Sequence, residues 1–148
     1  MTRRKSAFTA IIAAFTFAGS AAAQEQGQAA SPQPLSIELN KSADTAAGCR
    51  LTFVAKNDTG SAVDKASYEI AVFDSNNQVA RLLIFEFGSL ALGKTKVVEF
   101  EYPNLKCGGL SRILVNTSPE CIVGGTPASP LCLANLKTTS LSTIAFNQ

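Results

Sequence analysis

The chain has 148 residues, of which 46% are apolar and 16% are charged, with 13 basic and 11 acidic side chains. This length fits one ordinary domain. A formal charge of +2 is too small to indicate a protein that binds nucleic acid. Because the chain contains no His, it lacks both the commonest metal ligand and the commonest general base of enzymes.

Residues 1–23 have the three regions of a secretory signal peptide. Arg3, Arg4 and Lys5 form a basic start, residues 7–18 carry no charge, and three alanines precede Gln24. Twelve uncharged residues are too few to span a hydrocarbon core of ~30 Å as a helix, so we expect no stable membrane anchor after cleavage. The Arg3-Arg4 pair also allows the twin-arginine route. Ser6 stands where that route prefers a large apolar residue, and we therefore favour general secretion.

Cleavage after Ala23 leaves 125 residues with ten basic and eleven acidic side chains, a net charge of −1. The basic balance of the precursor therefore belongs to its signal. Residues 24–34 are rich in Gln, Ala and Pro and are predicted to form a flexible leader. Residues 35–148 are predicted to form a single domain in the periplasm or, after secretion, outside the cell.

All four cysteines, Cys49, Cys107, Cys121 and Cys132, lie in the exported part. An even number of cysteines in an oxidising compartment favours disulfides. Three pairings are possible, and we prefer Cys49–Cys107 with Cys121–Cys132. The first would join one strand to a distant segment, and the second would close a local loop. A zinc site is disfavoured because the chain contains no C-x2-C pair.

From residue 35 onward the sequence shows short runs of strand-like alternation separated by turn residues. The runs occupy residues 35–39, 51–55, 68–73, 79–87, 97–102 and 112–115, and a last strand is expected within residues 136–146. Six or seven strands at roughly ten-residue spacing are typical of a sandwich. The sequence thus predicts an all-β, antiparallel, immunoglobulin-like β-sandwich, with an open β-barrel as the alternative. The signal-peptide helix and the leader would precede it.

Several short motifs occur together in this part of the chain: Leu39-Asn40-Lys41, Cys49, Asn57-Asp58-Thr59-Gly60, Val72-Phe73-Asp74, Leu90-x-x-Gly93-Lys94, Cys107-Gly108-Gly109 and Arg112-Ile113-Leu114-Val115-Asn116. In these motifs the chain resembles a family of small exported alphaproteobacterial proteins with four cysteines. The resemblance covers about residues 35–140. It implies a periplasmic setting, but no activity, because the family has none that is established.

No residue is predicted to be catalytic, to bind a cofactor or to bind a metal. A Ser-His-Asp triad is impossible without His, and Lys41-Ser42 and Lys65-x-Ser67 lack the S-x-x-K spacing of a Ser–Lys pair. Glu99 and Glu101 would lie on one strand face, ~6–7 Å apart. Paired carboxylates can hydrolyse glycosides. The neighbouring apolar residues need the opposite face for the core, so a solvated strand face is the preferred interpretation.

Two oxygen-rich features are interpreted as turns. Residues 74–78 begin like a calcium-binding loop but lack its glycine and its closing glutamate, and a hairpin turn is predicted instead. Asn57 and Asn116 each begin an N-x-[ST] sequon. A sequon matters only where exported proteins are glycosylated, so both are read as turn residues.

The feature most relevant to function is an excess of apolar side chains on two strands. If residues 68–73 and 79–87 pair, Phe73, Leu82 and Ile84 would form a patch on the outer face. An exposed patch of this kind marks a partner-binding surface. In the alternative interpretation, loop 124–136 or the C-terminal tail covers the patch and makes it a second small core.

We therefore expect a non-enzymatic exported protein that serves as a periplasmic binding or interaction module, with another envelope protein as its partner. One alternative is a structural or assembly subunit of the envelope, in which the leader and residues 35–39 add a strand to a neighbour. The other is an enzyme with an unrecognised site. The sequence leaves the oligomeric state open.

Overall fold

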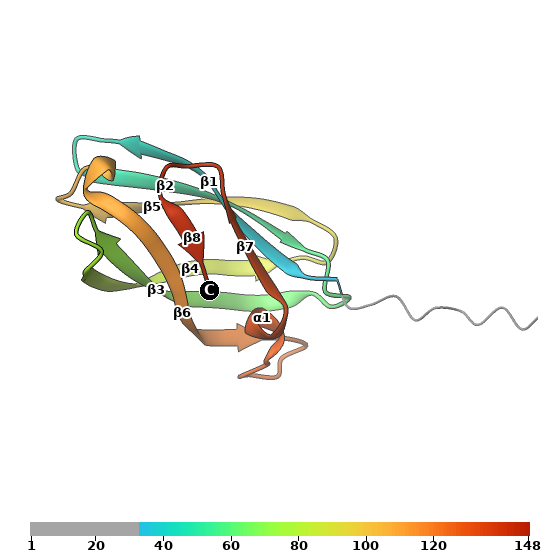
Figure 1. The fold of residues 1–148 in the computed structure, drawn as a ribbon. Helices are drawn as coiled ribbons and strands as arrows, with labels where there is room; N and C mark the ends of the chain where they lie inside the picture. Colours follow the sequence, from blue (N-terminus) through green and yellow to red (C-terminus); the bar gives the residue numbers. More distant parts are fainter. Residues whose placement is uncertain (1–32) are drawn as a thin grey trace, which may run out of the picture.

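The computed structural model describes residues 33–148 (Figure 1). The predicted signal peptide and residues 24–32 of the predicted leader lie outside the described residues. Within the described range the structure contains these elements: β1 (Leu35–Asp44), β2 (Gly48–Asn57), β3 (Val63–Asp74), β4 (Val79–Leu90), β5 (Thr95–Pro103), a 3-10 turn (Cys107–Gly109), β6 (Leu110–Ile122), α1 (Leu131–Ala134), β7 (Leu136–Ser140) and β8 (Ala145–Asn147).

The strands form two four-stranded sheets that pack face to face (Figure 1). One sheet, here sheet A, has the order β5-β2-β1-β7, and the other, sheet B, has the order β4-β3-β6-β8. Within its first six strands the chain crosses between the sheets after β2, after β4 and after β5. These crossings give the first six strands the Greek-key arrangement of an immunoglobulin-like sandwich. The predicted β-sandwich is therefore confirmed, and the alternative of a barrel is wrong because the two sheets do not close on each other.

The prediction of a purely antiparallel sandwich is wrong at the C-terminus. β7 runs parallel to β1, and β8 runs parallel to β6. Parallel neighbours cannot be joined by a tight hairpin, and neither pair is consecutive in the chain: β2 to β6 lie between β1 and β7, and β7 lies between β6 and β8. The tail also forms two strands instead of the single strand predicted there.

The predicted strands were placed correctly but were too short. Gly88 was expected to end the fourth run, yet it lies inside β4 at φ 67°. There it forms an irregularity where the register against β3 shifts. A positive φ at a bulge costs a glycine little because it has no Cβ, so the strand continues to Leu90.

The core is built around Phe53 of β2. Its ring makes edge-to-face contacts with four other phenylalanines, at centroid distances of 5.4–5.9 Å: Phe85, Phe87, Phe100 and Phe146. Three of these partners come from β4 and β8 in sheet B, and the fourth, Phe100, comes from β5 in sheet A. The inward positions of the alternating runs thus meet in one aromatic cluster that joins the two sheets.

The structure pairs Cys49 with Cys107 and Cys121 with Cys132, the two pairs preferred from the sequence. The first disulfide joins the start of β2 to the 3-10 turn that precedes β6. The second closes the crossover after β6 and ties α1 to the end of that strand. Both half-cystines of the second bridge are buried.

Two motifs that are distant in sequence meet around Asn57. Its buried amide donates to the backbone oxygens of Ser61 and Leu90, both at 2.8 Å. Its own backbone carbonyl accepts from the nitrogen of Gly93 at 2.7 Å. The predicted turn role of Asn57 is confirmed. The side chain also fixes the end of β4 against the end of β2.

Candidate interaction surface

β4 is an edge strand of sheet B, and its outward face is apolar. Val79, Leu82 and Ile84 expose 57%, 52% and 48% of their surface. Residues that pair across strands share a face, and these three pair with Phe73, Ala71 and Glu69 of β3 on the outside of sheet B. We call Val79, Leu82 and Ile84 the β4 patch. A cluster of large apolar side chains on one face of an edge strand needs a physical explanation.

The three predicted patch residues differ in how much of their surface is exposed. Leu82 and Ile84 are exposed as expected, but Phe73 retains only 8% exposure. The guanidinium of Arg112 lies 3.6 Å from the centroid of the Phe73 ring. Asn77 holds this guanidinium by accepting a hydrogen bond from Arg112 Nε at 2.9 Å. Phe73 is thus covered by a cation, and Val79, which the sequence analysis had not placed in the patch, takes the third position.

Neither segment proposed as a cover lies over the patch. β8 is at the opposite edge of sheet B, and β7 is at the far edge of sheet A. α1 contacts β6 and β7. The alternative of a second small core is therefore wrong for Leu82 and Ile84. Arg112 is the group that sequence reasoning missed, because its position over Phe73 depends on the cross-strand register.

On the same side of the sandwich, the edge of β4 lies over the edge of β5. The rings of Phe85 and Phe100 stack across this side at a centroid distance of 4.2 Å. Leu83, Val98 and Phe100 are only partly buried, although they point into the core. The apolar surface of the β4 patch therefore continues around the strand edge into this seam between the sheets.

Polar groups protect both ends of the β4 edge. Lys96 of β5 donates from Nζ to the backbone oxygen of Phe87 at 2.7 Å and to that of Ser89 at 3.2 Å. At the other end the guanidinium of Arg81 lies 5.6 Å from the ring centroid of Tyr102. A lysine on an edge is a common protection against unwanted strand pairing. The middle of β4, from Leu82 to Phe85, carries no charged side chain.

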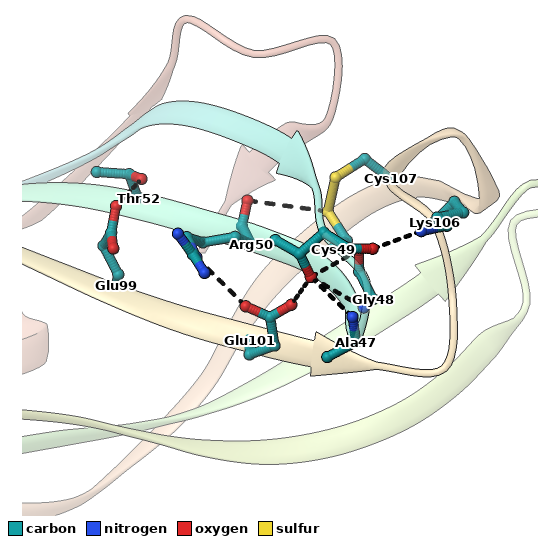
Figure 2. A network of polar contacts seen from close by, with 10 residues as sticks. Ala47, Gly48, Cys49, Arg50, Thr52, Glu99, Glu101, Lys106 and Cys107 are labelled. Atoms are coloured by element: carbon teal, nitrogen blue, oxygen red, sulfur yellow. Dashed lines mark hydrogen bonds and ion pairs between the residues drawn. A yellow bond between two sulfur atoms is a disulfide. The ribbon is translucent and has the colours of Figure 1, made fainter.

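The two carboxylates singled out from the sequence belong to a polar network on the outer face of β2 and β5 (Figure 2). Glu99 accepts a hydrogen bond from Thr52 at 3.0 Å. Glu101 accepts from Thr45 and pairs with Arg50 at 3.3 Å. Each carboxylate is thus occupied by a neighbour, an arrangement that favours the interpretation of a solvated strand face.

Lys106 donates to the backbone oxygen of Thr45 beside the Cys49–Cys107 bridge (Figure 2). The hydroxyl of Thr45 in turn accepts from the backbone nitrogen of Gly48 at 3.0 Å. The network therefore orders the β1–β2 turn around the disulfide.

The other candidates also have structural partners. Lys65 forms an ion pair with Glu120 at 2.8 Å, and this carboxylate raises the pKa of the lysine through its hydrogen bond and its charge. Ser67 accepts from the backbone nitrogen of Glu120, so Lys65 and Ser67 do not form a nucleophile–base pair. Asp74 accepts from the backbone nitrogens of Asn76 and Gln78, both at 2.9 Å, as a turn residue does.

A shallow hollow of about 300 Å³ lies on the outer face of sheet A, and Glu38, Lys56 and Lys137 contribute its charged groups. Lys56 is paired with Asp58 at 2.8 Å, and Glu38 accepts from Asn40 at 2.8 Å. Among residues 33–148, no group of three or more His, Cys, Asp or Glu side chains lies close enough to hold a metal ion.

Comparison with protein-family models, curated proteins and solved structures finds no match to this chain. In the part of the chain that the structure describes, no helix has the length and apolar character needed to cross a membrane.

Proposed function

We propose that this protein is a non-enzymatic exported interaction module that binds another protein through β4. The observation that carries the proposal is the β4 patch, which places three large, half-exposed apolar side chains on one face of one edge strand. Such a strand offers a partner both apolar side chains and unpaired backbone groups, the two elements of binding by strand addition.

The two disulfides support an exported location, because disulfides persist in oxidising compartments. Both are closed within the domain, and no free cysteine remains among the described residues. We propose the periplasm as the site of action, with an envelope protein as the partner.

The alternative of a structural subunit loses the strand-addition route that the sequence suggested. Residues 35–39 belong to β1, which lies inside sheet A with β2 on one side and β7 on the other. Both hydrogen-bonding edges of this segment are occupied, so it cannot add a strand to a neighbour. β4, in contrast, has β3 on one side only.

A photocrosslinking amino acid at Leu82 tests the proposal in intact cells. We expect one dominant crosslinked product that retains a defined partner. The control carries the same amino acid at Leu141, which is 70% exposed in the connection between β7 and β8, on the other side of the sandwich. Equal crosslinking from both positions, or no crosslinking from Leu82, would contradict the proposal.

A further inference from the structure

The open middle of β4 has a pattern that complements itself. We propose that β4 pairs antiparallel with β4 of a second copy of this chain, about a two-fold axis at Leu83. The inference rests on the proposed function of the β4 patch and names its partner. Sheet B would then continue across the axis as one sheet of two molecules.

The outer face is complementary in this register. When Leu83 lies on the axis, Leu82 faces Ile84 of the second copy, and Ile84 faces its Leu82. Both side chains are about half exposed in the single molecule, so two apolar cross-strand pairs would replace four exposed groups. Cross-strand apolar pairs of this kind stabilise a sheet.

The inner face is complementary as well. Leu83 points toward the seam that is lined by Val98 and Phe100, where all three side chains are partly exposed. The second Leu83 would lie beside the first, over this seam. The pairing therefore covers the outer patch and the open side of the core together.

The charges of the strand favour the antiparallel arrangement. β4 carries Arg81 before its open middle and Glu86 after it. In the proposed register Glu86 faces Ala80 of the second copy on the outer face, and Arg81 faces Phe85 of the second copy on the inner face, so no like charges lie opposite each other. A parallel pairing would bring like charges together, and moving the axis to Ile84 would put Leu82 against Glu86. Like charges placed directly opposite each other destabilise a strand pair, and the proposed register avoids them.

The leader of this chain fits the edge less well than a second copy does. Residues 24–34 contain no large apolar side chain and include two prolines. Proline lacks the backbone N–H that strand pairing needs, and such a segment has no side chain that could face Leu82 or Ile84.

The first test measures the monomer–dimer equilibrium of the chain from residue 24 onward by sedimentation velocity over a concentration series. Ile84→Lys is expected to weaken dimerisation about tenfold or more, because each dimer loses two apolar pairs and gains two charges at the contact. The matched control is Val97→Lys, at a 60% exposed valine on the outer face of edge strand β5, and it should leave the equilibrium unchanged. Circular dichroism and the thermal midpoint check that both variants are folded.

The second test determines the register. Leu82→Cys and Ile84→Cys are prepared separately, mixed and oxidised. The mixture is expected to give more disulfide-linked dimer than either variant alone, because residues 82 and 84 face each other only across the proposed axis. A higher yield from Ile84→Cys alone would place the axis elsewhere and overturn the register.

A protein that is monomeric at all concentrations, or a dimer that Ile84→Lys does not weaken, would overturn the inference. The proposed function would survive such a result if Leu82 still crosslinks to a different protein in cells. If Leu82 crosslinks to nothing, the proposed function fails as well.

Discussion

At the residue scale, the pairing of Phe73 with Arg112 decides which apolar side chains remain available to a partner. The guanidinium covers the ring at 3.6 Å from its centroid, and cations are attracted to aromatic faces. Phe73 is thereby removed from the surface while Leu82 and Ile84, on the neighbouring strand, stay exposed. A single cross-strand contact thus sets one border of the β4 patch.

Asn57 is predicted to be important for stability. Asn57→Ala removes the side-chain donor to the backbone oxygen of Leu90 and one of the two side-chain donors to that of Ser61. It also removes the acceptor for the backbone nitrogen of Thr59. We expect the free energy of unfolding to fall by about 3 kcal/mol, measured by urea denaturation. The matched control is Asn76→Ala in the exposed β3–β4 turn, which should change the value by less than about 0.5 kcal/mol. Equal effects would show that the buried amide contributes nothing.

Tyr68 is predicted to make stability fall at alkaline pH. Its hydroxyl donates to the backbone oxygen of Cys132 at 3.2 Å, and burial raises the pKa of Tyr68 above its usual value. The folded state therefore favours the protonated form. This contribution is complete below the unfolded pKa of about 10 and is lost as the pH rises beyond it.

Tyr68→Phe tests this dependence. The variant should be about 1 kcal/mol less stable at neutral pH, where the hydrogen bond is lost. The difference from the natural protein should shrink as the pH approaches about 11. Urea midpoints across this range measure both curves, and parallel curves would contradict the assignment.

At the scale of the element, β4 combines a buried inner face with an apolar outer face on an edge. The bulge at Gly88 and the two carbonyl contacts of Lys96 lie at its C-terminal end. Bulges and lysines are devices that discourage edge pairing. The middle of β4 has neither a bulge nor a lysine, and for this reason we place the proposed partner contact there.

Two substitutions on the outer face of sheet B test which side chains there are buried and which are exposed to solvent. Phe73→Ala removes a buried ring and should cost about 3 kcal/mol of stability. Ile84→Ser, at a position that is 48% exposed, should change stability by less than about 0.5 kcal/mol. Thermal or urea unfolding at low protein concentration measures both. A large loss from Ile84→Ser under these conditions would mean that Ile84 is internal.

The two disulfides are expected to contribute unequally. Cys49 and Cys107 are separated by 58 residues, whereas Cys121 and Cys132 are separated by 11. In the chain-entropy account the longer loop restricts the unfolded chain more. Replacing both half-cystines by alanine should cost about 4 kcal/mol for the first bridge and about 3 kcal/mol for the second. The ranking, measured by urea denaturation of the two double variants, would be wrong if the shorter loop proved more costly to open.

At the scale of the whole molecule, the signal peptide predicted from the sequence would make the chain from Gln24 onward the acting form. Mass spectrometry of the envelope fraction should find a chain that begins at Gln24. Replacing Arg3 and Arg4 by lysine should leave export intact if the general route is used, because that route needs only positive charge. Accumulation of the full-length precursor after this replacement would instead indicate the twin-arginine route.

The sequence by itself determined the sandwich, its inward positions and the preferred cysteine pairs. Alternation with period two is a local property of each strand, and it correctly placed Phe53, Phe85 and Phe100 toward the core. It did not give the strand ends, since Gly88 reads locally as a terminator but continues β4 as a bulge.

Only the tertiary structure decided what the strands lie beside. The parallel placement of β7 and β8, the burial of Phe73 under Arg112 and the position of β4 at an edge all depend on which strands become neighbours. Strand neighbours are set by contacts between residues far apart in the chain, and these leave no periodic signal in the sequence. For the same reason the β4 patch was visible as an apolar excess on two strands, but its true membership, Val79, Leu82 and Ile84, required the register.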